Sequence, residues 1–191
     1  MSDLHKRYEA IVIGASAGGF LTLCALLDGI PSTYSLPIIL VQHRSKVSRD
    51  LLEEVLQGRC RIQVKQAEEK EKVRSAIVYV APPDYHLLVE ADKTLSLTAD
   101  APVRFSRPSI DVLFESAAIA YQDKLIGIIL TGANNDGAMG ICAIADRGGL
   151  TIAQNPQEAA HPSMVQAAID TMKVNYIWPV STIRNFLLQL S

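Results

Sequence analysis

Residues 9–19 read Glu-Ala-Ile-Val-Ile-Gly-Ala-Ser-Ala-Gly-Gly. The apolar run 10–13 has the length and β-branched content of a buried strand, and residues 20–27 read as a helix. Between them the sequence matches the pattern G-x-S-x-G, with Ser16 at its centre. A serine on a sharp strand-to-helix turn points its hydroxyl out of the sheet edge, because the flanking glycines let the backbone turn without Cβ clashes. The stretch therefore predicts a strand, a turn and a helix that present Ser16 as a candidate nucleophile.

Two other interpretations of this turn stay open. In the first, Ser16 merely caps the helix that follows. In the second, the turn binds a nucleotide, although Gly14, Gly18 and Gly19 do not form G-x-G-x-x-G and no acidic residue ends the second strand to hold a ribose. The choice depends on whether a base and an orienting carboxylate occur at matching positions elsewhere in the chain.

The overall composition is that of a globular domain. Of 191 residues, 49% are hydrophobic and 20% are charged, which suits one domain over residues 1–191 with a sizeable core. The net charge is −2 and both signs are interspersed, so neither nucleic acid nor an anionic membrane is expected as the main partner.

The sequence also bears on the compartment. Its three cysteines are far apart and form no C-x-x-C pair, which fits a reducing setting. No apolar run approaches the ~20 residues that span a bilayer, and the first seven residues lack the core of a signal peptide. We therefore expect a cytoplasmic protein with no direct membrane insertion.

Apolar runs of strand length alternate with helical patterns along the rest of the chain. This alternation predicts an α/β fold with a mainly parallel, doubly wound sheet and helices on both faces. Residues 86–90 and 94–98 flank a short polar turn and predict a small antiparallel hairpin insertion. The other expected strands are 37–42, 61–65, 76–81, 124–131, 150–154 and 174–178, and the other expected helices start at Ser48 and Ser109 or span 138–146, 163–172 and 180–190.

In such a sheet, functional groups gather outside the carboxyl ends of the strands. Ser16 follows the first strand, His43 directly follows the second, and Asp136 lies in the loop after residues 124–131. A serine needs a base to remove its proton, and the imidazole needs a carboxylate to fix its tautomer and stabilise the imidazolium. We therefore predict Ser16 as nucleophile, His43 as general base and then acid, and Asp136 as the orienting carboxylate.

Other histidines and acids compete for these roles. His86 also follows a strand at the same edge, but it begins an alternating strand, where a structural histidine is common. Asp111 lies in the first turn of a helix and is explained by dipole complementarity alone, and Asp136 could likewise be a helix N-terminal acid. His5 lies in a charged tail and His161 in a loop, so neither is a strong candidate.

Several motifs occur in one order along the chain. They are Ile-Gly-Ala-Ser-Ala-Gly-Gly at 13–19, Val-Gln-His at 41–43, Leu-Thr-Gly-Ala-Asn-Asn-Asp-Gly at 130–137, and the segments 80–86, 107–114 and 148–154. Together they resemble the chemotaxis protein-glutamate methylesterase family, the CheB catalytic domain. The resemblance runs from about Ala10 to the last helix, so it covers nearly the whole chain.

The resemblance implies a function. The family hydrolyses γ-glutamyl methyl esters on the cytoplasmic part of methyl-accepting chemotaxis receptors, and some members deamidate glutamine there. Its nucleophile, histidine and aspartate fall on Ser16, His43 and Asp136, in an order that differs from the Ser, Asp, His order of α/β-hydrolases. A methylated receptor is the implied partner, with a methyltransferase or a separate response regulator as further candidates. No cofactor and no metal are expected.

The departures from the family pattern concern the oxyanion site and the substrate. Backbone N–H groups of Ala17 and of the loop at Ala133 are the candidate oxyanion donors. Ala17 stands where threonine is common, and Ala133 and Asn134 stand where many members have methionine and glycine. Residues 44–46 replace a more apolar stretch, and Arg44 could supply a local positive potential. The receiver domain that many members carry does not precede the first strand, so phosphorylation control within this chain is not expected.

Two alternative functions remain at this point. One is amidase or small-ester hydrolysis by the same three residues. The other is a non-catalytic signalling module that binds a receptor or a methyltransferase, which only the loop departures favour.

Overall fold

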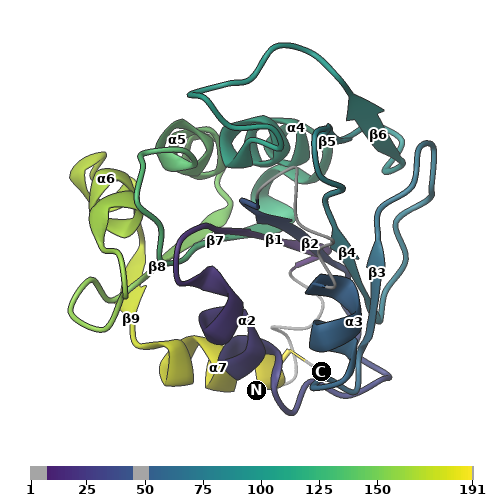
Figure 1. Cartoon of the computed structure of the whole chain (residues 1–191), viewed down its shortest axis with the longest axis horizontal. Coiled ribbons are helices and arrows are strands. Elements are labelled where there is room, and N and C mark those ends of the chain that lie inside the picture. The colour runs from purple at the N-terminus through teal and green to yellow at the C-terminus, as the bar shows by residue number, and fades with distance from the viewer. Residues whose placement is uncertain (1–7, 45–51, 191) are drawn as a thin grey trace.

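A parallel sheet lies at the centre of the structure (Figure 1). The computed structural model describes residues 8–44 and 52–190. Within them the strands of this sheet are β1 (Ala10–Ala15), β2 (Ile38–Gln42), β3 (Gln63–Gln66), β4 (Ile77–Val80), β7 (Leu125–Ile129), β8 (Leu150–Gln154) and β9 (Tyr176–Trp178). Their order is β3-β4-β2-β1-β7-β8-β9, and every pairing between neighbours is parallel.

Helices cover both faces of the sheet, as Figure 1 shows. On one face lie α2 (Gly19–Leu27), α3 (Leu52–Gln57) and α7 (Val180–Leu188), and on the other lie α4 (Ile110–Tyr121), α5 (Ala138–Asp146) and α6 (Ser163–Asp170). A short 3-10 turn, η1 (Gln122–Lys124), leads from α4 into β7. The expectation of a doubly wound sheet is confirmed.

Strand β1 is buried on both faces, which explains its unbroken apolar sequence. Ile11 and Ile13 belong to the core that contains Leu23 of α2. Val12 faces the opposite way and belongs to the core that contains Phe114 of α4. The sheet therefore separates two cores, and β1 contributes alternate side chains to each.

The predicted hairpin is present as β5 (His86–Val89) and β6 (Leu95–Thr98), paired antiparallel. The β5 strand is tied to α4 by a 3.1 Å hydrogen bond from the Val89 N–H to Ser116 Oγ. The predicted helix start at Ser48 lies outside the described residues. Within the described residues, the corresponding helix α3 begins at Leu52. Among the helices that the structure describes, none is long and apolar enough to cross a membrane.

The order of the strands fixes where a site can form. The loop after β1 leads to α2 on one face, whereas the loop after the neighbouring β7 leads to α5 on the other. Loops that diverge in this way leave a crevice outside the carboxyl ends of the two strands. The loops that carry Ser16, His43 and Asp136 follow β1, β2 and β7, so all three border this crevice.

Candidate active site

Ser16 lies in the tight turn between β1 and α2. Its N–H donates to Thr131 O at 3.0 Å, and its carbonyl accepts the Gly19 N–H at 2.8 Å. Gly18 completes the turn with φ +78°, a conformation that side chains with a Cβ rarely adopt. Gly18 is also the N-cap of α2, and no side chain caps that helix, so the interpretation of Ser16 as a mere cap is wrong.

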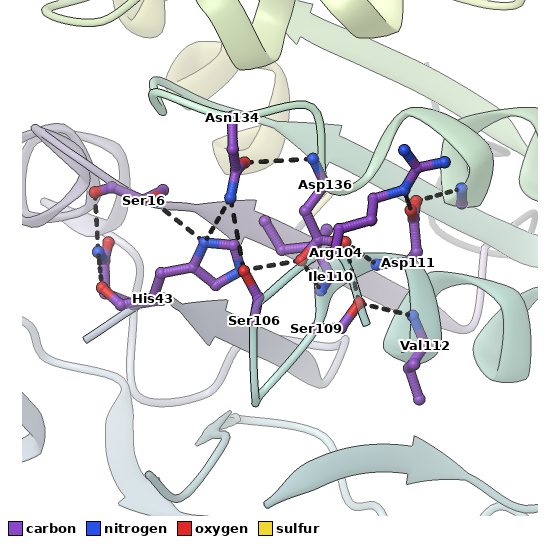
Figure 2. A network of polar contacts seen from close by, with 12 residues as sticks. Ser16, His43, Arg104, Ser106, Ser109, Ile110, Asp111, Val112, Asn134 and Asp136 are labelled. Carbon is purple, nitrogen blue, oxygen red and sulfur yellow. Dashed lines mark hydrogen bonds and ion pairs between the residues drawn. The ribbon is translucent and has the colours of Figure 1, made fainter. Parts of the chain in front are cut away.

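His43 lies between the other two predicted residues, as Figure 2 shows. Its Nδ1 is 3.1 Å from Ser16 Oγ, and its Nε2 is 2.9 Å from Asp136 Oδ2. The backbone holds this position, because the His43 N–H donates to Ala15 O at 2.9 Å. The structure therefore brings together the hydroxyl, the imidazole and the carboxylate in one hydrogen-bonded line.

Gln42 connects the loop that carries Ser16 with the loop that carries His43. Its Nε2 donates to Ser16 O at 2.8 Å and to His43 O at 2.9 Å, and the side chain is buried. One amide thus fixes the backbone of the candidate nucleophile and of the candidate base. The sequence places Gln42 beside His43 but indicates no role for it, because a single amide carries no signal until its partners are known.

Asp136 is completely buried at the amino end of α4. Oδ1 accepts from Ser109 Oγ at 2.9 Å and from the Asp111 N–H at 3.0 Å. Oδ2 accepts from the Ile110 N–H at 2.7 Å, in addition to His43. These donors include N–H groups that a helix cannot satisfy internally, and the helix dipole there also favours a negative charge.

The same contacts set the ionisation of Asp136. Burial alone would raise the pKa of its carboxyl, but the hydrogen bonds from His43 and from the Asp111 and Ile110 N–H groups outweigh it and hold the pKa below its ordinary value. An ionised carboxylate only accepts hydrogen bonds, so the facing Nε2 of His43 carries the ring proton. Nδ1 is then left with a lone pair toward Ser16 Oγ, as a general base requires.

Asp111 and Ser109 make hydrogen bonds that the sequence did not indicate. Asp111 Oδ2 accepts from Arg104 Nε at 3.0 Å and Oδ1 accepts the Gly140 N–H at 2.8 Å, so dipole complementarity alone does not explain it. Burial raises the pKa of Asp111, and the nearby Asp136 charge adds to this. Ser109 caps α4 as predicted, since its Oγ accepts the Val112 N–H at 3.4 Å while it donates to Asp136.

His86 is held away from this line by other partners. It is buried at the start of β5, where its Nδ1 accepts the Ser109 N–H at 3.1 Å and its Nε2 lies 3.2 Å from Ala101 O. With both ring nitrogens engaged by backbone groups, the structural interpretation of His86 is confirmed.

A pocket of about 560 Å³ opens at Ser16 and His43. Ala17, Arg44 and several residues between 102 and 108 form its remaining walls. Arg44 is bound to Glu53 by hydrogen bonds of 2.7 and 3.2 Å and to Ala81 O at 3.0 Å. Much of its charge is therefore neutralised by a partner within the protein.

Asn134 lies beside Ser16 and His43, as seen in Figure 2. Its Nδ2 lies 3.5 Å from His43 Nδ1 and 3.5 Å from Ser106 Oγ, while its Oδ1 accepts the Asp136 N–H at 3.2 Å. From the sequence, Asn134 is only a departure from a family pattern. Its side chain in fact lies on the serine side of the imidazole.

The two predicted oxyanion donors differ in position. Ala17 lines the pocket, and its N–H takes no part in the hydrogen bonds found among residues 8–44 and 52–190. Ala133 is exposed and is not among the residues that line the pocket. Across the part of the chain that the structure describes, no group of three or more His, Cys, Asp or Glu residues could hold a metal ion.

Comparison with known proteins agrees with this architecture. The family model of CheB methylesterase matches residues 11–187. A Leptospira interrogans protein named as a protein-glutamate methylesterase/protein-glutamine glutaminase is 48% identical over 184 residues, which are 96% of this chain and 95% of the relative. A Clostridium acetobutylicum protein of the same name is 32% identical, and the match covers 95% of this chain but 53% of that longer protein. The crystal structure of the Thermotoga maritima CheB methylesterase catalytic domain superposes with a TM-score of 0.92 at 30% identity, and covers 96% of this chain and 99% of that one. The chain belongs to the CheB methylesterase family.

Proposed function

We propose that this protein hydrolyses γ-glutamyl methyl esters on proteins, with Ser16 as nucleophile, His43 as general base and acid, and Asp136 as the orienting carboxylate. The observation that carries the proposal is the continuous line from Ser16 Oγ through both His43 ring nitrogens to the buried Asp136 carboxylate. The names of the relatives support the substrate class.

In the first half of the reaction, Ser16 Oγ attacks the ester carbonyl while His43 Nδ1 takes its proton. Asp136 stabilises the imidazolium through the 2.9 Å contact with Nε2. The imidazolium then returns the proton to the departing methoxide, so methanol leaves and the glutamyl group stays on Ser16. In the second half, His43 deprotonates a water molecule, which attacks the acyl-enzyme. The imidazolium then returns the proton to Ser16 Oγ as the glutamate side chain leaves.

Ala17 is the preferred oxyanion donor, because this residue follows the nucleophile directly and lines the pocket. For the second donor, the Ala133 N–H is the first candidate. Asn134 Nδ2 is the alternative, since it lies 3.5 Å from the nitrogen that faces Ser16. Variants of Asn134 distinguish these two, because a backbone donor survives side-chain truncation.

The same residues can carry out glutamine deamidation. An amide carbonyl would be attacked in the same way, and ammonia would leave in place of methanol. The second half of the name of the Leptospira and Clostridium relatives favours this as an additional activity. The proposed macromolecular partner is the methylated cytoplasmic domain of a chemotaxis receptor, and the proposed location of the reaction is accordingly the cytoplasm.

The direct test is methanol release from a methylated receptor fragment. We expect turnover by the wild-type protein and a loss of roughly 10⁴-fold or more in kcat for Ser16→Ala, because the covalent step is lost. Ser32→Ala is the matched control, since Ser32 is exposed and lies in a loop after α2. Wild-type turnover by Ser16→Ala on any ester would show that the nucleophile is another group. Equal inactivity of both proteins, with binding retained, would favour the non-catalytic module.

A further inference from the structure

Phe105 is a large aromatic residue that is fully exposed to solvent. It lies at the apex of a two-residue turn closed by reciprocal hydrogen bonds between Val103 and Ser106, of 3.1 and 2.8 Å. Both central residues of the turn, Arg104 and Phe105, have positive φ, of 47° and 64°. This region is uncommon for non-glycine residues, so the surrounding structure must impose it.

Ion pairs hold the turn on both sides of Phe105. Before it, Arg104 Nε donates to Asp111 Oδ2 at 3.0 Å. After it, Arg107 donates to Asp84 Oδ1 at 2.6 and 2.9 Å and to the carbonyl of Asp100 at 2.9 Å. The backbone position of Phe105 is therefore set by its neighbours and not by packing of its own ring.

The turn that carries Phe105 lies at the pocket that contains the candidate nucleophile. Phe105 lines the same pocket as Ser16 and His43, and the loop that carries it runs from β6 over the molecule to α4 (Figure 1). An exposed aromatic side chain on a held turn beside the candidate nucleophile is suited to contact with a substrate, because its burial on binding is favourable.

The proposed substrate has a geometric requirement that bears on Phe105. Three carbon–carbon bonds of about 1.5 Å separate the Cα of glutamate from its ester carbon, so they span at most about 4 Å. When the ester carbon reaches Ser16, the main chain of a protein substrate must therefore cross the mouth of the pocket. A small free ester enters without such a segment.

We infer that Phe105 is a specificity-determining residue that packs against an apolar side chain of the polypeptide next to the esterified glutamate. The inference rests on the proposed function, since it concerns the substrate of that same site. It assigns Phe105 to the binding of macromolecular esters and gives it no part in the chemistry at Ser16.

The test compares Phe105→Ala with wild type on two kinds of ester. The substrates are a methylated receptor fragment and N-acetylglutamate γ-methyl ester. For the receptor fragment we expect KM to rise about 10- to 100-fold with kcat unchanged, and for the small ester we expect no change in either. Phe105→Leu, which keeps an apolar side chain, should recover most of the lost affinity.

Met172→Ala is the matched control. Met172 is also exposed and at positive φ, of 57°, but it follows α6 and does not line the pocket. A second pair of substrates probes the contact itself: two peptides with one γ-methyl glutamate, flanked by leucine or by serine. The Phe105→Ala effect should appear with the leucine peptide and vanish with the serine peptide.

The outcomes separate the two proposals. If wild type and Phe105→Ala cleave the receptor fragment with equal KM, the role of Phe105 is overturned while the proposed function stands. An equal loss on the small ester would also overturn it, since the change would then act on the site as a whole. If wild type cleaves the small ester but not the receptor fragment, the proposed function is wrong. The proposed contact between Phe105 and the polypeptide then fails as well.

Discussion

The backbone N–H of Ile110 donates a 2.7 Å hydrogen bond to Asp136 Oδ2, the same oxygen that faces His43 Nε2. The first turn of α4 thereby holds the carboxylate that is proposed to orient the base. The contact depends on a close approach between α4 and β1, because a Cβ at Gly14 would lie 2.4 Å from Ile110 Cγ2.

Gly14→Ala is therefore expected to disturb the site by pushing Ile110 and the first turn of α4 away from β1. The added methyl group must displace Ile110 or shift α4, which should lower the free energy of unfolding by about 1–3 kcal/mol and reduce kcat. Urea denaturation and methanol release measure the two effects. Gly58→Ala is the control, because its Cβ would meet only ordinary contacts at 3.5 and 3.6 Å. Adding Ile110→Ala to Gly14→Ala should restore part of the stability by making room, and strict additivity of the two changes would contradict this explanation.

Asp136→Asn should lower kcat by up to about 10⁴-fold. The amide is close to the carboxylate in shape, but its NH₂ group can face His43 and favour the tautomer in which Nδ1 carries the proton and cannot act as a base. The measurement is single-turnover methanol release beside a circular dichroism spectrum that reports the fold. Wild-type kcat in this variant would remove Asp136 from the proposed mechanism.

The free energy of unfolding should depend on pH through the ionisation of Asp136. Its pKa is below the ordinary value in the folded state, so the folded protein binds fewer protons than the unfolded chain near pH 4. Its contribution to stability is complete above the ordinary aspartate pKa of about 3.9 and is lost as the pH falls through the lower folded-state pKa.

Comparison of wild type with Asp136→Asn measures this contribution. Asp111 acts in the opposite direction, because its raised pKa gives stability at low pH that is lost as the pH rises. Burial, the main cause of the Asp111 shift, is present in both proteins, whereas the smaller part that comes from the Asp136 charge is lost in the variant. We expect the difference in the free energy of unfolding to be larger at pH 6 than at pH 3. Urea midpoints across this range give the difference, and a constant value would contradict the lowered pKa.

Gln42→Met should weaken both stability and catalysis. Methionine matches the length of glutamine but cannot donate to the carbonyls of Ser16 and His43, which leaves two partly buried acceptors without this donor. The expected cost is about 1–3 kcal/mol in the free energy of unfolding, with a fall in kcat of up to about 100-fold if the loops shift. Gln63→Met, at an exposed position in β3, is the control. Unchanged kcat in Gln42→Met would show that the two loops hold their geometry without the amide.

Much of the fold followed from local patterns. The β/α alternation gave the class of sheet, and the helix 138–146 and the strand 150–154 agree with α5 and β8 to the residue. Strand order was not accessible in this way. For example, β4 lies between β2 and β3 although it follows β3 in the chain, because pairing depends on long-range packing that no local period records.

The sequence by itself determined which groups are the candidates for the reaction and at which edge of the sheet they lie. Ser16, His43 and Asp136 each follow a strand, and in a parallel sheet that position places them at one edge whatever the order of the strands. Only the tertiary structure decided how those groups are held: the Gln42 amide between two loops, the amino end of α4 around Asp136, and Asn134 beside the imidazole. The physical reason is the sequence separation over which each kind of interaction acts. Strand and helix patterns repeat over a few residues, whereas these hydrogen bonds join segments up to 91 residues apart and exist only after the sheet has closed the distance.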